Sequence, residues 1–253
     1  MIKSKKLNKF QSINHAFFNR VGGKSTGIFK SLNCGPGSTD TKKDILKNLT
    51  IVRKKINTDS KKIILLNQIH SDKFYFIDKN SKLLKNKLKG DALITNKTDL
   101  PIAVLTADCA PILIHDDKAK MIAAIHAGWK GAYKGIVAKV VSFMIKKGCS
   151  SKNMTAAIGP CIAVNNYEVK EDFIKKFIKK NKKNKIFFKK MNNKRYFDLN
   201  KYIQSHLKAL NIKKIDIINK DTFNPKNNFF SARRSIKRKE NDYGRNISLI
   251  MIN

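Results

Sequence analysis

TADCAPILIHDDKAKMIAAIHAGWKG, residues 106–131, carries the strongest structural signal in this chain. Three short apolar runs of strand length lie in it or beside it, at residues 102–105, 111–114 and 121–125. Such runs, bounded by turn-forming residues, predict buried strands, and Asp-Asp-Lys at 116–118 predicts a hairpin turn between the last two. Cys109 and His126 each lie at the end of a run. A fold that brings these strand ends together would place a thiol beside an imidazole.

These two residues also have a purely structural interpretation. Free cysteine is often a small buried hydrophobe, and His126 could merely cap a strand. However, two glycines, Gly128 and Gly131, flank Trp129, the only tryptophan of the chain. Glycine at such positions allows the backbone to approach another group closely. We therefore interpret residues 106–131 as the core of an active site.

A second histidine, His70, follows an apolar run at residues 63–69 that predicts another buried strand. Two imidazoles and a thiolate suit zinc, and three protein ligands leave a fourth position open, as in catalytic zinc sites. His70, Cys109 and His126 are therefore candidate metal ligands and catalytic residues. A cysteine nucleophile with a histidine base needs only two of them and remains an alternative. Asp108 could orient a ligand or shuttle a proton, or it could simply hold the turn.

Length and composition narrow the class of protein. With 253 residues, 42% of them apolar, the chain can bury a core as one large domain or two small ones. No apolar run approaches the roughly 20 residues of a membrane span, and residues 1–15 lack a secretion signal. The four cysteines are widely spaced, which indicates neither a disulfide framework nor a zinc finger. We expect a cytoplasmic protein that does not associate with membranes.

Helix and strand patterns alternate along the rest of the chain. Predicted helices cover residues 41–55, 136–144, 171–180 and 198–210, and further predicted strands cover residues 28–29, 74–77, 90–95, 155–158, 215–218 and 247–252. The lysine-rich residues 79–89 are typical of a solvated loop. Interleaved elements with several hairpins predict a mixed sheet in one α/β domain over residues 1–253, rather than a doubly wound sheet.

The net charge of +36 suggests nucleic-acid binding at first sight. However, the lysines are scattered from end to end, and no recognisable nucleic-acid module accompanies them. We interpret the charge as solvated surface, expecting no specific nucleic-acid partner and only weak, salt-sensitive binding to polyanions. Only seven of the 54 basic residues are arginines, so a retained arginine indicates a need for its planar fork. Arg20, beside Gly22 and Gly23, could present this fork to an anion, or it could be exposed on an ordinary hairpin.

Nine short motifs carry a family resemblance. In chain order they are HAFFNRVGGKSTG, SLNCG, NQIH, GDALIT, TADCAPIL, HAGWKG, AIGPCI, YEV and FFSARR. Together they resemble the laccase-domain family over residues 15–234, a family first named multicopper polyphenol oxidases and now assigned as zinc-dependent purine nucleoside phosphorylases with adenosine deaminase activity. The resemblance implies a four-layer αββα sandwich with mixed β-sheets, similar to the Cys-His deamidase domain of a bacterial toxin. It also implies one zinc ion per chain, held by His70, Cys109 and His126.

The resemblance implies small-molecule substrates: adenosine, guanosine, inosine or methylthioadenosine, together with phosphate. Deamination would occur at purine C6, where other zinc deaminases act. Phosphorolysis needs a bound phosphate, for which Arg20, Arg233 and Arg234 are the candidate ligands. A Cys-His hydrolase or deamidase and a polyanion-binding protein are alternatives. Copper is disfavoured, because a multicopper site needs many imidazoles and this chain has five histidines without a His-x-His pair.

Overall fold

The computed structural model describes residues 1–58, 60, 62–78, 81 and 88–253, and its largest element is a six-stranded mixed sheet. In spatial order the strands are β11 (Lys214–Ile217), β7 (Met154–Ile158), β5 (Ala110–Asp116), β6 (Met121–Ala127), β3 (Ala92–Thr95) and β2 (Phe74–Ile77). The four central strands pair antiparallel, whereas the edge strands β11 and β2 pair parallel to their neighbours. Every residue of β5, β6 and β7 is buried, so this sheet is covered on both faces.

A three-stranded antiparallel sheet packs against the large sheet. Its strands, in spatial order, are β1 (Ile13–Phe17), β12 (Asn246–Ile252) and β4 (Ile102–Thr106). Ile122 and Ala124 of β6 share one apolar core with Ile250 of the small sheet. The alternate residues Ala123 and Ile125 point to the opposite face and join a second core. The large sheet therefore separates the two cores.

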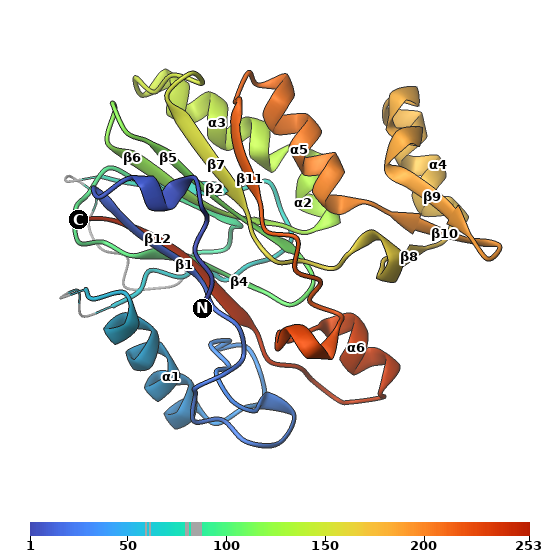
Figure 1. Ribbon diagram of the computed structural model, residues 1–253, viewed down its shortest axis with the longest axis horizontal. Helices are drawn as coiled ribbons and strands as arrows, with labels where there is room; N and C mark the ends of the chain where they lie inside the picture. Colours follow the sequence, from blue (N-terminus) through green and yellow to red (C-terminus); the bar gives the residue numbers. More distant parts are fainter. Residues whose placement is uncertain (59, 61, 79–80, 82–87) are drawn as a thin grey trace.

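Helices cover the outer faces of both sheets (Figure 1). The large sheet is covered by α2 (Trp129–Lys134), α3 (Ile136–Lys146) and α5 (Leu199–Ala209), and the small sheet by α1 (Lys42–Lys55). Val140 of α3 and Leu207 of α5 lie in the core that contains Ile125. Val52 of α1 packs with Leu249 of β12. The predicted αββα sandwich with mixed β-sheets is thereby confirmed.

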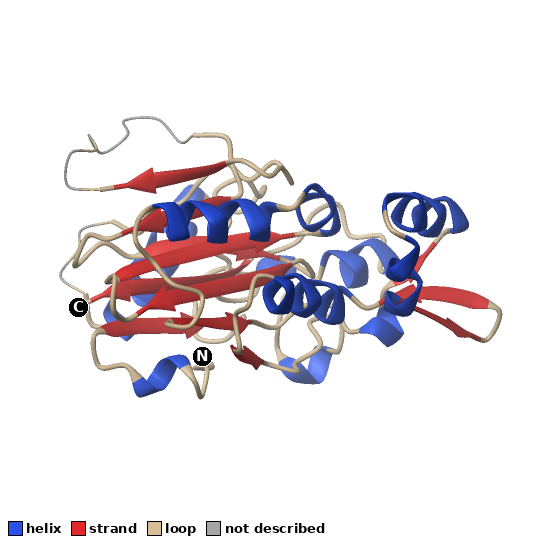
Figure 2. Ribbon diagram, turned by 90° about the horizontal axis from the view of Figure 1, so that it is seen from above, coloured by secondary structure: helices blue, strands red, loops and turns tan. Residues whose placement is uncertain are grey.

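A small lobe lies at one end of the sandwich (Figure 2). It consists of β8 (Glu168–Val169), α4 (Glu171–Lys180), the 3-10 helix η4 (Lys182–Phe187), β9 (Phe188–Met191) and β10 (Lys194–Phe197). Aromatic rings hold it together, since the centroids of Phe173 and Phe177 lie 4.7 Å apart and those of Phe177 and Phe197 lie 4.9 Å apart. The ring of Trp129 lies 5.0 Å from Phe173. The lone tryptophan therefore links the lobe to the segment that follows His126.

The remaining elements are short. They are the 3-10 helices η1 (Leu7–Lys9), η2 (Gly27–Phe29), η3 (Val164–Asn166) and η5 (Pro225–Asn227), and the helix α6 (Ala232–Lys237). Residues 79–80 and 82–87 of the predicted lysine-rich loop lie outside the described residues. Among the helices that are described, none has the length and apolar character needed to span a membrane.

Two predicted strands are wrong. Residues 63–69 form isolated bridges rather than a strand. The reason lies in the Gln68 side chain. Its Nε2 donates to the carbonyl of Leu105 and its Oε1 accepts from the backbone N–H of Leu105, so the side chain replaces a backbone ladder at this point. Residues 28–29 belong to η2, which begins at Gly27 in the left-handed region with φ of +55°.

Candidate functional site

The fold brings His70, Cys109 and His126 together. Sγ of Cys109 lies 3.7 Å from Nε2 of His70, and the three ligand atoms all lie within 4.8 Å of one another. Ligand atoms around a tetrahedral zinc, with bonds of about 2.0–2.3 Å, lie roughly 3.3–3.8 Å apart. The cluster could therefore hold one metal ion after only small side-chain shifts.

The strand register explains this convergence. β5 and β6 pair antiparallel with Pro111 opposite His126, so Cys109, just before β5, lies beside the end of β6. Gly128 then carries the chain past the cluster. A Cβ atom on Gly128 would lie 2.8 Å from Sγ of Cys109 and 2.9 Å from Cδ2 of His70. Any side chain at residue 128 would therefore displace the thiol and the imidazole.

A buried carboxylate that the sequence motifs did not single out holds both histidines. Asp91, fully buried just before β3, accepts a hydrogen bond of 2.8 Å from Nδ1 of His126. It also accepts from the His70 amide at 3.0 Å and from the amide and hydroxyl of Ser71. The first contact leaves Nε2 of His126 free for Cys109 or a metal, and the others hold His70 in the left-handed region at φ +56°. The available signal was an aspartate preceding a buried strand in GDALIT, because a buried carboxylate needs several donors.

The charges in this cluster favour a thiolate. Burial alone would raise the pKa of the Cys109 thiol, but the charge of His126 and hydrogen bonds to His126 and His70 lower it to about 6. Burial would lower the pKa of His126, but the Cys109 thiolate and the Asp91 carboxylate raise it to about 9. Burial also opposes ionisation of Asp91, yet donors from His126 and Ser71 bring its pKa down to about 2. The thiolate is the form in which cysteine binds metals and attacks substrates.

Asp108 is engaged elsewhere. Its carboxylate accepts hydrogen bonds from the hydroxyls of Thr222 and Ser231, at 2.6 and 2.9 Å, and from the amide of Arg233 at 2.7 Å. Burial raises the pKa of Asp108, although these donors oppose the shift. The carboxylate thus ties the turn before Cys109 to the start of α6. This placement favours the alternative that Asp108 holds the turn over a role in catalysis.

Two of the three predicted anion-binding arginines stabilise backbone. The guanidinium of Arg234 is largely buried and donates to the carbonyls of Thr222, Phe223 and Phe229. Arg20 donates through Nε to the carbonyl of Lys30, and its guanidinium lies 5.0 Å from the ring centroid of Phe230. Arg234 thus uses both Nη groups on carbonyls of the protein, whereas Arg20 uses Nε alone. Neither arginine belongs to the described lining of the cavity that contains Cys109.

The third predicted arginine, Arg233, packs against Tyr167. Its guanidinium lies 5.5 Å from the ring centroid of Tyr167 and donates to the carbonyl of Glu168 at 3.1 Å. Burial, followed by the charge of Cys109, raises the pKa of the Tyr167 phenol. Tyr167 therefore lies within the electrostatic influence of the thiolate, with Arg233 on its ring.

A cleft of about 470 Å³ opens beside the cluster. It is lined by Gly35, Pro36, Gly37, Leu66, Asn67, Gln68, His70, Leu105, Thr106, Ala107, Cys109, His126, Tyr243 and Arg245. This volume suits a small-molecule ligand. None of the three predicted arginines lines it, whereas Arg245, which was not predicted, does. The signal that could have found Arg245 is the one used for Arg20, an arginine retained beside a glycine in a lysine-rich chain.

Fold and site together define an αββα protein with a candidate metal centre in the wall of a ligand-sized cleft. The model of the family described as multi-copper polyphenol oxidoreductase laccase matches residues 14–253, and the chain belongs to this family. The resemblance drawn from the nine motifs is thereby confirmed.

Named relatives and solved structures agree. The chain is 37% identical over 175 residues to a purine nucleoside phosphorylase of Rickettsia prowazekii (strain Madrid E), covering 68% of this chain and 71% of the relative. It is 36% identical over 187 residues to a purine nucleoside phosphorylase of Rickettsia conorii (strain ATCC VR-613 / Malish 7), covering 73% of this chain and 75% of the relative. A Neisseria meningitidis protein of the DUF152 family superposes with a TM-score of 0.85 at 26% identity over 96% of each chain.

Proposed function

We propose that this chain is a zinc-dependent purine nucleoside phosphorylase that also deaminates adenosine. The observation that carries the proposal is the cleft of about 470 Å³ with His70, Cys109 and His126 in its wall. Two relatives that share more than a third of the aligned residues are named purine nucleoside phosphorylases. The substrates would be inorganic phosphate and adenosine, guanosine, inosine or methylthioadenosine. All four cysteines are free, which fits a cytoplasmic enzyme.

The donor set fits zinc better than a harder cation, because it combines a thiolate with two imidazoles. His70, Cys109 and His126 would hold the ion, and a bound zinc would supply Lewis acidity at the cleft wall. The chain itself orients the ligands, since Asp91 fixes the His126 ring through Nδ1 and the His70 loop through the backbone. Such supporting contacts commonly contribute to metal affinity.

The rest of the cleft would bind and position the substrates. In phosphorolysis a phosphate oxygen forms the new bond to the anomeric carbon of the ribose, while the bond to the purine nitrogen breaks. In deamination water supplies the oxygen at C6, and the amino group leaves as ammonia. The apolar side chains of Leu66 and Leu105 line the cleft and would keep bulk water from competing with phosphate. Arg233, whose guanidinium lies over the ring of Tyr167, would be a further substrate contact.

A Cys-His hydrolase or deamidase is the second candidate function. Cys109, with a pKa lowered to about 6, would be the nucleophile. The His126 imidazole would be its base, and the Asp91 carboxylate would orient the imidazole. Nucleophilic attack would require a free thiolate, whereas zinc would engage the same sulfur. Metal content therefore separates the two functions directly.

The other histidines support a single metal rather than a copper cluster. Nε2 of His15 accepts a backbone hydrogen bond, His115 packs edge-on against Phe10, and the His206 ring lies 4.4 Å from that of Tyr202. Each therefore has a structural contact within the fold. A multicopper oxidase would need several of these imidazoles as ligands.

The test combines metal analysis with product identification. The wild-type protein should contain one zinc per chain and release ribose 1-phosphate from a nucleoside plus phosphate, and inosine and ammonia from adenosine. Cys109→Ala should lose zinc and both activities while remaining folded. Cys149→Ala is the matched control, because that buried thiol contacts Met121 rather than the cluster, and it should keep both. Stoichiometric zinc in Cys109→Ala would refute the ligand assignment, and a metal-free active wild type would favour the hydrolase.

A further inference from the structure

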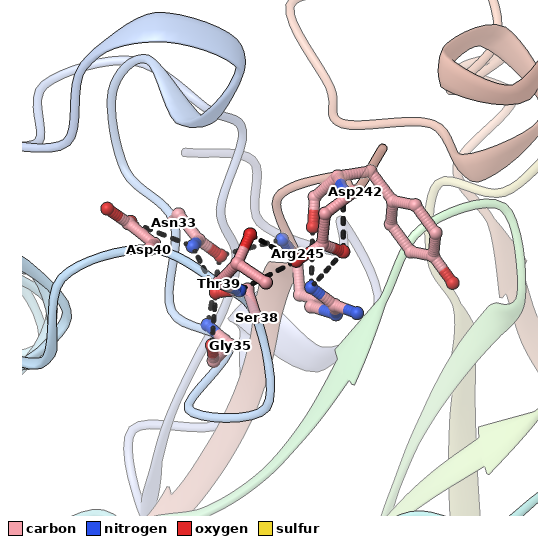
Figure 3. A network of polar contacts seen from close by, with 8 residues as sticks. Asn33, Gly35, Ser38, Thr39, Asp40, Asp242 and Arg245 are labelled. Carbon is pink, nitrogen blue, oxygen red and sulfur yellow. Dashed lines mark hydrogen bonds and ion pairs between the residues drawn. The ribbon is translucent and has the colours of Figure 1, made fainter. Parts of the chain in front are cut away.

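One wall of the cleft is formed by two loops that a polar network joins (Figure 3). Oδ1 of Asn33 accepts from the amides of Gly35 and Arg245, at 3.0 and 2.9 Å. Asp242 accepts from the amide and hydroxyl of Thr39, at 2.7 and 3.2 Å. Gly35 gives the Arg245 side chain room, since a Cβ atom there would lie 2.3 Å from Cδ of Arg245. The two loops therefore form one unit that positions Arg245 in the cleft wall.

Arg245 is held by only one edge of its guanidinium. Nη1 donates to Oδ1 of Asp242 at 3.1 Å and to the carbonyl of Tyr243 at 2.6 Å, and the guanidinium lies 4.5 Å from the Tyr243 ring centroid. Within the described part of the chain, Nε and Nη2 donate to no protein acceptor. These two groups form the parallel pair of donors with which arginine binds phosphate or carboxylate oxygens. The side chain is thus fixed in place with its binding edge available.

The charges along the cleft also indicate that Arg245 binds an anion. Among the described residues that line it, Arg245 is the only one with a permanent charge. Although the chain carries 54 lysines and arginines, none of the described lysines lines the cleft. Surface composition therefore does not explain a cation at this position. The Asp242 carboxylate pairs with Nη1 of Arg245 at 3.1 Å and leaves the Nε and Nη2 edge as the cationic group that the described lining presents to an anion.

We propose that Arg245 forms a subsite for a phosphate group in the same cleft as Cys109. This inference rests on the proposed function in one respect, since inorganic phosphate would be the co-substrate that the subsite supplies. The same donors would also bind the phosphoryl group of a nucleoside monophosphate. In either case the Nε and Nη2 groups of Arg245 donate to two phosphate oxygens, while Asp242 and the Tyr243 carbonyl fix the guanidinium.

The experiment measures phosphate binding directly in the purified, metal-loaded protein. Equilibrium dialysis gives the Kd of inorganic phosphate, adenosine monophosphate and inosine, each added alone, for wild type, Arg245→Met and Arg245→Lys. Arg238→Met is the control for lost charge, because Arg238 is 58% exposed and outside the cleft lining. Metal content and thermal midpoint report whether each variant is folded, and Arg245→Lys covers the case in which the methionine variant is not.

Arg245→Met should weaken phosphate binding on the order of 10- to 100-fold, as expected for lost charge-assisted hydrogen bonds. Arg245→Lys should keep only part of the affinity because it lacks the fork. Inosine binding by the Arg245 variants, and phosphate binding by Arg238→Met, should not change. A loss confined to the monophosphate would assign the subsite to a nucleotide rather than to free phosphate.

Two results would overturn the subsite. One is that the folded Arg245 variants bind both phosphate compounds with wild-type affinity. The other is that the wild type binds neither phosphate compound. The proposed function fails separately. If phosphate binding depends on Arg245 but no ribose 1-phosphate forms, the subsite stands and phosphorolysis does not. If phosphorolysis proceeds with an unchanged KM for phosphate in Arg245→Met, phosphorolysis stands and the subsite does not.

Discussion

Two buried histidines predict a loss of stability in mild acid. His15 of β1 is 2% exposed and His115 of β5 is fully buried. Burial lowers the pKa of each imidazole to about 4, and the charge of Lys3 contributes at His15. Neither ring nitrogen of His115 has a hydrogen-bond partner among the described residues. An imidazolium there would lack the hydration or pairing that a buried charge needs.

The direction and size of the effect follow from proton linkage. An unfolded histidine titrates near pH 6.5, so between about pH 6.5 and 4 the unfolded state binds more protons than the folded state. The contribution of these two histidines to stability is therefore complete above pH 6.5 and declines as the pH falls toward 4. From pH 7 to pH 5, one such group removes about 2 kcal/mol, and both together remove about 4 kcal/mol. This is a large share of a typical total of roughly 5–15 kcal/mol.

Urea unfolding at pH 7 and pH 5 measures the effect, with His115→Leu as the perturbation. The carboxylates and His126 titrate in both proteins, so the difference between their pH dependences isolates His115. The variant should lose about 2 kcal/mol less than wild type between the two pH values. His206→Leu, which replaces a half-buried imidazole of α5, should recover less. Equal losses in wild type and His115→Leu would refute the reasoning.

Three further predictions concern the site and the surface. Asp91→Asn should lower zinc affinity roughly 10- to 100-fold in a competition titration with a chelator, because a neutral amide cannot accept all the donors around it; unchanged affinity would exclude the orienting role. Gly128→Ala should reduce zinc content in the folded protein, since its Cβ would lie 2.8 Å from Sγ of Cys109; full occupancy would show that the cluster tolerates a methyl group at this position. Across a salt series, the KM for phosphate should rise moderately while deamination of neutral adenosine barely changes. A deamination rate that fell in step with nucleic-acid release would show that the basic surface belongs to the mechanism.

The fold was predictable where an apolar period coincided with clear boundaries. The hairpin of β5 and β6 and the amphipathic helix α3 follow directly from runs of buried residues between polar turns. The same rule failed at residues 63–69, because a run of apolar residues does not reveal that a Gln68 side chain replaces the strand ladder. At residues 63–69 the pattern misjudged burial as well as pairing, since only Leu65 and Leu66 are buried and Ile69 is 43% exposed.

The types of the candidate ligands were predictable, whereas the residues that orient them were not. A thiol and an imidazole at the ends of paired strands can be read from local patterns, as for Cys109 and His126. Asp91 lies 35 positions before His126 in the chain, and its role depends on how β3 pairs with β6. The arginines show the same limit. An arginine in a lysine-rich chain indicates a position that needs a guanidinium. This signal does not distinguish Arg234, which donates to backbone carbonyls, from Arg245, which lines a cleft.

The assembly of the cluster is coupled to the packing of the two sheets. His70 approaches from a loop that crosses to β4 through Gln68, whereas His126 ends a strand of the large sheet. Asp91 connects them, and its full burial means that its carboxylate gains donors only when both segments are in place. A left-handed residue such as His70, which costs roughly 1 kcal/mol or more in isolation, persists because these hydrogen bonds determine it. A mutation that loosens β3 should therefore weaken metal binding before it unfolds the chain.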